Sequence, residues 1–172
     1  MRHMRHLFPW KKSRGVTLVE LCFGMAIMAL LAGLAAPGFR TSLRVAAVRT
    51  ATYELLAGLQ QTRGNSILES RPGIVCPSDA AGNCLPAAQA SSFWRASIDT
   101  SEHPVERERR DLPSGVTVRA SRSPLRFWPD ALAASNGTLT ICDTQRVAPP
   151  RAIVLSLSGR ARVSPAAIAA CP

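Results

Sequence analysis

The order of apolar and polar residues divides the chain into three stretches of different character. Residues 16–37 form an apolar run with a single charge, Glu20, and the basic cluster KKSRG precedes this run. A run of about 20 apolar residues is long enough to span a bilayer as a helix, and the positive flank predicts that its N-terminal side stays cytoplasmic. We therefore expect a transmembrane and assembly helix over residues 16–37.

The second stretch, residues 38–70, has the periodicity of an amphipathic helix. Pro37 and Gly38 predict a kink where it begins. Further on, apolar and small residues recur at i, i+3, i+4 and i+7, so we expect one face of this helix to pack on a sheet. Gly58 and Gly64 are expected to be weak points in it. The predicted buried stripe consists of Leu43, Ala46, Ala47, Thr50, Tyr53, Ala57 and Gln60.

The third stretch, residues 71–172, contains short β-like runs separated by turn residues such as those at 113–115 and 158–159. Asn and Gly at 136–137, followed by alternating residues, predict a hairpin turn. Residues 106–111 are nearly charge-balanced and predict either a solvated loop or a strand edge. A long N-terminal helix packed on antiparallel strands is an α+β fold. The expected strands are 74–76, 93–98, 116–119, 125–128, 138–142, 152–157 and 160–163.

The net charge adds a second division of the chain. The 172 residues include 21 Lys and Arg against 11 Asp and Glu, a formal charge of +10. Residues 1–15 hold five Lys or Arg and no acid, residues 16–111 hold nine Arg and nine acids, and residues 112–172 hold seven Arg against two Asp. The two basic regions therefore need separate explanations. Because 47% of the residues are hydrophobic, we expect a folded core rather than a disordered basic tail.

The residue inventory disfavours catalysis. The chain has three histidines, and two of them lie in the first six residues, which leaves His103. No plausible triad and no metal-ligand spacing is present, so we expect neither an enzyme nor a bound metal or cofactor. Trp94 and Trp128 are expected to fill the core rather than stack on bases, because no regular aromatic spacing marks a single-strand platform.

The five cysteines indicate the compartment. Cys22 lies in the apolar helix, whereas Cys76, Cys84, Cys142 and Cys171 lie in the β-rich part. A translocated domain enters an oxidising compartment, so these four are expected to form two disulfides. Three pairings are possible. We favour Cys76 with Cys84, which closes a small loop, and Cys142 with Cys171, which ties the C-terminus to a strand.

The first basic region resembles the class III signal of type IV pilins and type II secretion pseudopilins. The leader, residues 1–15, ends in Gly15, Val16 would become the mature N-terminus, and Glu20 stands at the fifth mature position. The resemblance implies cleavage by prepilin peptidase, insertion in the inner membrane with a periplasmic domain, and pairing of Glu20 with the methylated terminal amine of a neighbouring pilin. An ordinary secretory signal cleaved after residues 33–35, or a plain membrane anchor, is the alternative.

The second basic region contains Arg160 and Arg162 near the end of the chain. Side chains two apart on a strand face the same side, roughly 6.6 Å from one another. That spacing suits neighbouring phosphates of nucleic acid, and the planar guanidinium donates two parallel hydrogen bonds to phosphate. Gly159 is expected to make the turn that exposes the two arginines.

Residues 137–143 and 151–162 resemble the GspH/FimT family of pilin-like proteins. Gly159, Arg160 and Arg162 match the GRxR motif of the FimT minor pilins of natural transformation. The resemblance implies a type IV pilin-like α+β fold and a minor pilin that binds DNA on the pilus during uptake, largely without sequence preference.

Other arginines are weaker candidates for the same surface. Arg146 and Arg151 would widen it, and Arg119, Arg122 and Arg126 are expected to line an adjacent loop. The alternative is a structural minor pilin or type II secretion pseudopilin that does not contact DNA. In that case the late arginines protect an edge strand against aggregation.

Overall fold

The computed structural model describes residues 15–100, 104–130, 133–166 and 171. The predicted leader, up to residue 14, and His103 lie outside these ranges. The chain divides into two compact units, residues 1–39 and 40–172, and helix α1 (Leu18–Leu68) contributes to both. Within the described ranges no single helix is long and apolar enough to cross a membrane. The segments Leu18–Leu34 and Gly38–Leu68 meet that requirement only as a bent pair.

In the first unit, a capping box marks the start of α1. One carboxylate oxygen of Glu20, Oε2, accepts hydrogen bonds from the backbone N–H and the hydroxyl of Thr17, each at 2.9 Å. The N–H of Glu20 donates to Thr17 Oγ1 at 3.3 Å. Reciprocal bonds of this kind satisfy amides that the first helical turn leaves unpaired. Glu20 thus stabilises the beginning of the helix, whatever else it binds.

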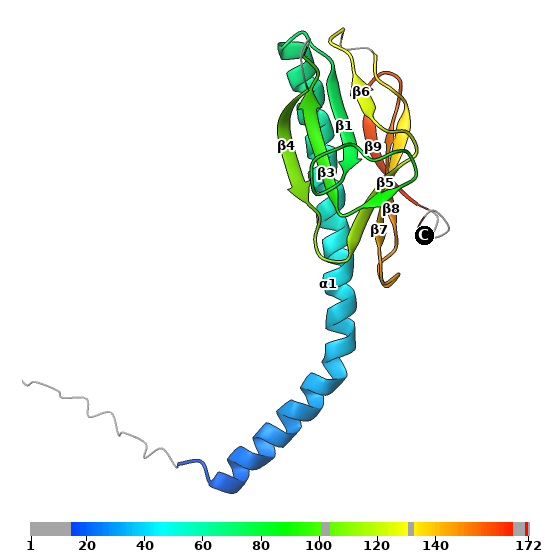
Figure 1. Ribbon diagram of the computed structural model, residues 1–172. Helices are drawn as coiled ribbons and strands as arrows, with labels where there is room; N and C mark the ends of the chain where they lie inside the picture. The colour runs from blue at the N-terminus through cyan, green and yellow to red at the C-terminus, as the bar shows by residue number, and fades with distance from the viewer. Residues whose placement is uncertain (1–14, 101–103, 131–132, 167–170, 172) are drawn as a thin grey trace, which may run out of the picture. The chain divides into compact units, whose positions relative to one another are not determined.

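The second unit contains two antiparallel sheets beside the later half of α1, which confirms the predicted α+β fold (Figure 1). The first sheet has the order β4-β3-β1-β6, and the second has the order β2-β5-β7-β8-β9. In chain order the strands are β1 (Gly73–Ser78), β2 (Ala90–Ser91), β3 (Phe93–Ile98), β4 (Val105–Asp111), β5 (Val116–Ala120), β6 (Leu125–Phe127), β7 (Gly137–Asp143), β8 (Arg151–Leu155) and β9 (Ala161–Pro165).

Both sheets and α1 contribute to one hydrophobic core. Helix and sheet approach one another closely at Gly58, where an ideal Cβ would lie 2.2 Å from Cη2 of Trp94. The packing of Trp94 therefore requires glycine at position 58. The expectation that Gly58 is a weak point of the helix did not include this contact. Trp94 is buried as predicted, with 1% of its surface exposed, but the same prediction for Trp128 is wrong, because Trp128 is 40% exposed.

The predicted buried stripe of the helix is also wrong. Leu43, Tyr53 and Ala57 are exposed, and a different face of α1 packs on the sheets. Two threonines on that face account for the error: the hydroxyls of Thr52 and Thr62 each donate to a carbonyl four residues earlier, at 2.7 Å. Bonded in this way, a buried threonine leaves no polar group unsatisfied. The buried face consists of Val48, Ala51, Thr52, Leu55, Gly58, Leu59, Thr62 and Ser66.

The predicted strands are present, with ends shifted by up to two residues. Residues 106–111 belong to edge strand β4. The expectation of a strand edge is therefore confirmed, and that of a solvated loop is wrong. The predicted hairpin turn at 136–137 is wrong: Gly137 begins β7 and pairs with Leu155 of β8, while the preceding β6 belongs to the other sheet. A Cβ at this position would lie 2.6 Å from Cδ2 of Leu125, so a larger residue would force the leucine side chain to shift.

The disulfides join Cys76 to Cys84 and Cys142 to Cys171, the pairing that we favoured. Cys22 is an exposed free thiol in α1. The second disulfide attaches the last described residue, Cys171, to β7 in the middle of the second sheet. It therefore holds the C-terminal end of the chain beside the strands that carry the late arginines.

Candidate nucleic-acid interface

The turn between β8 and β9 carries the first residue of the GRxR motif. The N–H of Gly159 donates to the carbonyl of Ser156 at 2.9 Å, and the N–H of Ser156 donates to the carbonyl of Arg160 at 3.0 Å. Gly159 has a φ of +73°, a conformation that side-chain-bearing residues rarely adopt. The predicted turn at 158–159 is therefore confirmed, and its geometry favours glycine.

Arg63 of α1 lies directly against this turn. Its Nη1 donates a hydrogen bond to the carbonyl oxygen of Gly159 at 3.2 Å. An ideal Cβ at position 159 would stand 3.1 Å from Nε of the same guanidinium. Two separate constraints therefore favour glycine at position 159: the backbone conformation and the close approach of Arg63. Sequence reasoning missed Arg63, because the contact joins residues that are far apart in the chain.

Arg160 and Arg162 are both exposed. Arg160 directly precedes β9 instead of lying in it, so the predicted strand 160–163 begins one residue too early. Among the described residues, neither arginine side chain has a hydrogen bond or an ion pair. Their guanidinium groups therefore keep their full donor capacity for an external anion.

The register of the second sheet shows which way Arg162 faces. Arg162 pairs with Val154 of β8, and Val154 pairs with Thr138 of β7, so these three side chains share one face. The neighbouring β9 residues, Ala161 and Val163, pack against the core on the opposite face. Arg162 therefore points away from the core.

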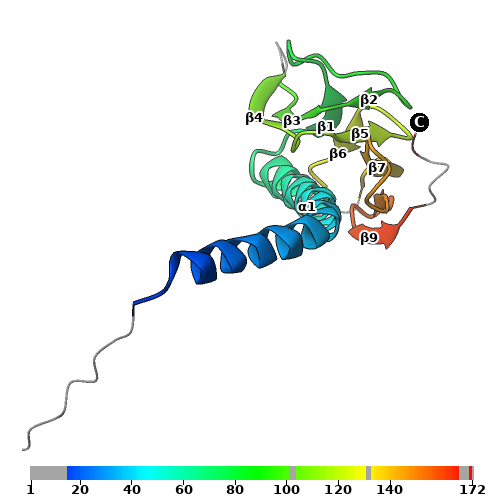
Figure 2. The ribbon, with the colours of Figure 1, turned by 90° about the horizontal axis from the view of Figure 1, so that it is seen from below.

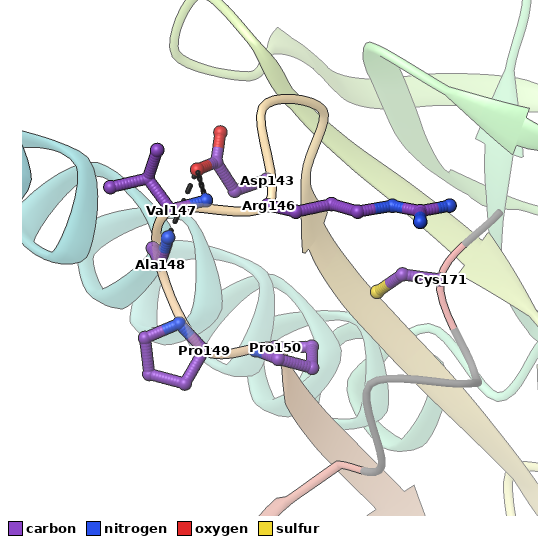
Figure 3. A pocket seen from close by; sticks show the side chains of 7 residues that line it. All are labelled: Asp143, Arg146, Val147, Ala148, Pro149, Pro150 and Cys171. Atoms are coloured by element: carbon purple, nitrogen blue, oxygen red, sulfur yellow. Dashed lines mark hydrogen bonds between the residues drawn. The ribbon is translucent and has the colours of Figure 1, made fainter.

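Arg146 belongs to the loop between β7 and β8, which Asp143 organises (Figure 3). Oδ2 of Asp143 accepts hydrogen bonds from the N–H groups of Val147 and Ala148, at 2.9 and 3.0 Å. Arg146 has a φ of +56° and is exposed, and its side chain extends away from the Asp143 carboxylate. This loop and Cys171 line a hollow of about 200 Å³.

The electrostatics of the loop depend on Asp143, which is almost fully buried. Burial by itself raises the pKa of this carboxyl. The amides of Ala148, Gln145 and Val147 and the positive charge of Arg44 outweigh burial, and the net result is a pKa below its ordinary value. Arg44 also donates to the carbonyl of Ser114 at 2.8 Å. An ionised Asp143 thus joins α1 to two loops of the second sheet.

Arg151 is the first residue of β8 and is half-buried. It lines a hollow of about 440 Å³ together with Tyr53 of α1 and the last three residues of β9. Arg146 and Arg151 lie on either side of the segment 147–150, and strand β8 separates Arg151 from the GRxR turn. Arg160 and Arg151 therefore lie near opposite ends of β9.

The other three late arginines differ in their surroundings. Arg126 pairs with Asp99 at 2.9 Å, so its charge is balanced by an acid in the protein. Arg122 is exposed, and Arg119 is half-buried in β5 opposite Thr140. Arg126 is therefore poorly suited to bind an external anion. Across the described ranges, no three His, Cys, Asp or Glu residues are grouped so that they would hold a metal ion.

The capped, apolar start of α1 and the two antiparallel sheets beside its later half define a type IV pilin-like protein. The sequence profile described as Type II transport protein GspH matches residues 51–159, more than half of the chain. The chain therefore belongs to the GspH family. A second profile, the prokaryotic N-terminal methylation motif, matches residues 10–36, which include Gly15, Val16 and Glu20. None of the curated proteins matches the sequence.

Solved structures of a minor pilin have the same fold. The type IV minor pilin FimU of Pseudomonas aeruginosa strain PAO1 superposes in one crystal form with a TM-score of 0.52 at 16% identity, over 68% of this chain and 92% of FimU. A second crystal form of FimU superposes with a TM-score of 0.53 at 16% identity, over 69% of this chain and 88% of FimU. At this identity the match establishes the pilin fold, which is the fold that the sequence predicts.

Proposed function

We propose that this pilin binds DNA through Gly159, Arg160 and Arg162 and takes part in DNA uptake on a type IV pilus. The observation that carries the proposal is the pair of exposed arginines, unpaired within the described chain, beside a turn that Arg63 holds. A guanidinium without an internal partner binds phosphate without first breaking an ion pair.

Binding of this kind is expected to be largely independent of sequence. Phosphate contacts carry no base information, and each neutralised phosphate releases counterions, so affinity falls with salt. Arg151 and Arg146 extend the basic surface on the side of the β7–β8 loop. We expect them to contribute to affinity and to the salt slope rather than to specificity.

The N-terminal features support the proposal that this activity belongs to a pilus. We infer that prepilin peptidase cleaves between Gly15 and Val16, and that residues 16–37 anchor the subunit in the inner membrane before assembly. The domain then faces the periplasm and later the cell surface. Glu20, whose carboxylate bonds to Thr17 in the isolated chain, would pair with the terminal amine of a neighbouring pilin in the filament.

The test is DNA binding by the full-length protein in detergent, with a salt titration. Replacing Arg160 and Arg162 by Gln should weaken binding to a short duplex and reduce the slope of log K against log salt by roughly two. Arg126→Gln is the matched control, because Arg126 is paired with Asp99 and its loss should leave the slope unchanged. Unchanged affinity in a folded double variant would refute the proposal.

A purely structural role is the second candidate, and the family description, a type II transport protein, favours it. In that case the subunit builds a secretion pseudopilus or primes a pilus without contacting DNA. Deletion of the gene distinguishes the two. Loss of transformation with pili intact supports DNA binding, whereas loss of protein secretion supports the structural role.

A further inference from the structure

Strand β9 lies beside α1 (Figure 2). Residues of both elements line two hollows. One hollow, about 360 Å³, lies at the start of β9, where Gln60 and Arg63 of α1 face Gly159 and Arg160. The other, about 440 Å³, lies at the end of β9, where Tyr53 of α1 faces Arg151 and Pro165. The boundary between helix and strand is thus hollowed at both ends of β9. We call this boundary the α1–β9 seam.

Each end of the seam has one arginine from α1 and one from β8 or from the turn that follows it. Arg63 and Arg160 line the first hollow. Arg151 lines the second, and the guanidinium of Arg49 lies over the ring of Tyr53, with Cζ 5.9 Å from the ring centroid. The described residues that line the two hollows include no acidic side chain. The seam therefore suits a polyanion that runs along β9.

Tyr53 gives the second hollow a chemistry that arginines lack. It is the only tyrosine in the chain, it is 48% exposed, and its ring belongs to the wall of the hollow. An exposed ring with guanidinium groups nearby suits a nucleic-acid base, because the ring stacks on the base while the cations bind the adjoining phosphates. A base paired inside a duplex does not offer its face to such a ring.

The length of the seam matches a short segment of nucleic acid. The five residues of β9 extend roughly 16 Å at the usual strand rise, and the ten steps of α1 from Tyr53 to Arg63 rise roughly 15 Å. A strand of stacked nucleotides advances about 3.4 Å per nucleotide, so about four or five nucleotides cover this distance. One strand can therefore contact both ends of the seam.

We propose that the α1–β9 seam is a track for single-stranded DNA, with Arg63, Arg160, Arg151 and Arg49 along the phosphates and Tyr53 stacked on an unpaired base. The inference rests on the proposed DNA-binding function and adds to it the strandedness of the ligand. The GRxR arginines attract either form of DNA, whereas Tyr53 favours the single strand.

The experiment compares two probes, a short oligo-dT and a duplex of the same length, by fluorescence anisotropy with the full-length protein in detergent. Tyr53→Leu, which keeps an apolar side chain but removes the ring, should weaken oligo-dT binding about tenfold and change duplex binding by less than about twofold. Tyr53→Phe keeps the ring and should bind both probes as the unmodified protein does.

The outcomes separate this inference from the function on which it rests. If Arg160→Gln with Arg162→Gln weakens both probes while Tyr53→Leu binds oligo-dT normally, the proposed function stands and the single-strand track is refuted. If the arginine variant binds both probes normally, the proposed function itself fails. If Tyr53→Leu leaves both affinities intact but removes the protein from pili, Tyr53 is a contact between subunits and the track is likewise refuted.

Discussion

Nη1 of Arg63 donates a hydrogen bond at 3.2 Å to the carbonyl oxygen of Gly159, across a separation of 96 residues. This bond joins the helix to the turn that presents Arg160. Because a helix is stiffer than a surface turn, the bond and the glycine conformation together hold the start of β9 beside α1. The position of the basic motif thus depends on a residue outside it.

Substitution of Gly159 by Ala should destabilise the domain by about 1–2 kcal/mol, since alanine resists a positive φ and its Cβ would press on Arg63. Urea unfolding of the full-length protein measures the change. Gly64→Ala is the matched control: nothing lies within 4 Å of its Cβ, so helix propensity alone should stabilise it by about 0.5–1 kcal/mol. Equal stabilities of the two variants would contradict the role given to Gly159.

Substitution of Gly58 by Ala should lower the stability of the domain, although alanine has a higher helix propensity than glycine. The added methyl group would lie 2.2 Å from Cη2 of Trp94, so the indole must move within a packed core, at a cost of about 1–3 kcal/mol. The change is measured by the same unfolding experiment and by the near-ultraviolet circular dichroism of the tryptophans. A variant as stable as Gly64→Ala would show that Trp94 is not packed against this position.

The stability of the domain should fall in acid partly through Asp143. Its pKa is lower in the folded protein than the ordinary value of 3.8, so it contributes stability that is present above that value and is lost as pH falls through the folded pKa. Asp143→Asn should cost about 1–3 kcal/mol at neutral pH and should flatten the dependence of stability on pH below about pH 5. Thermal unfolding across that range measures both effects.

Asp79 provides the comparison for Asp143. Hydrogen bonds from the side chain and the backbone of Asn83 also lower its pKa, but this carboxylate lies at the surface. Asp79→Asn should therefore change the acid dependence less than Asp143→Asn does. A larger effect from Asp79 would contradict the importance assigned to the buried carboxylate.

Replacing Cys142 and Cys171 together by Ser should destabilise the domain by roughly 2–4 kcal/mol, because the disulfide restricts the unfolded chain across 29 residues. Urea unfolding without reductant isolates this disulfide, since Cys76 and Cys84 remain joined. Cys22→Ser, at an exposed free thiol, should leave the unfolding of the domain unchanged. A double variant as stable as Cys22→Ser would show that the C-terminal disulfide does not constrain the fold.

The sequence alone determined the features that depend on local chemistry. The apolar run with Glu20 predicted the start of α1, alternating residues predicted most of the strands, and Gly159 predicted the turn of the GRxR motif. The cysteine spacing favoured the pairing that the structure has. Each of these depends on a few neighbouring residues, whose conformational preferences act before the chain is compact.

Only the tertiary structure decided which face of α1 is buried. Thr52 and Thr62 look polar in the sequence, but their hydroxyls donate hydrogen bonds to carbonyls within the helix, so both residues can be buried. The tertiary structure alone placed Arg63 against Gly159, Trp94 against Gly58, and Asp99 beside Arg126, which removes Arg126 from the basic surface. These contacts join residues distant in sequence and depend on the shapes that meet when helix and sheets pack. The pattern of polar and apolar residues along the chain does not predict how these surfaces fit together.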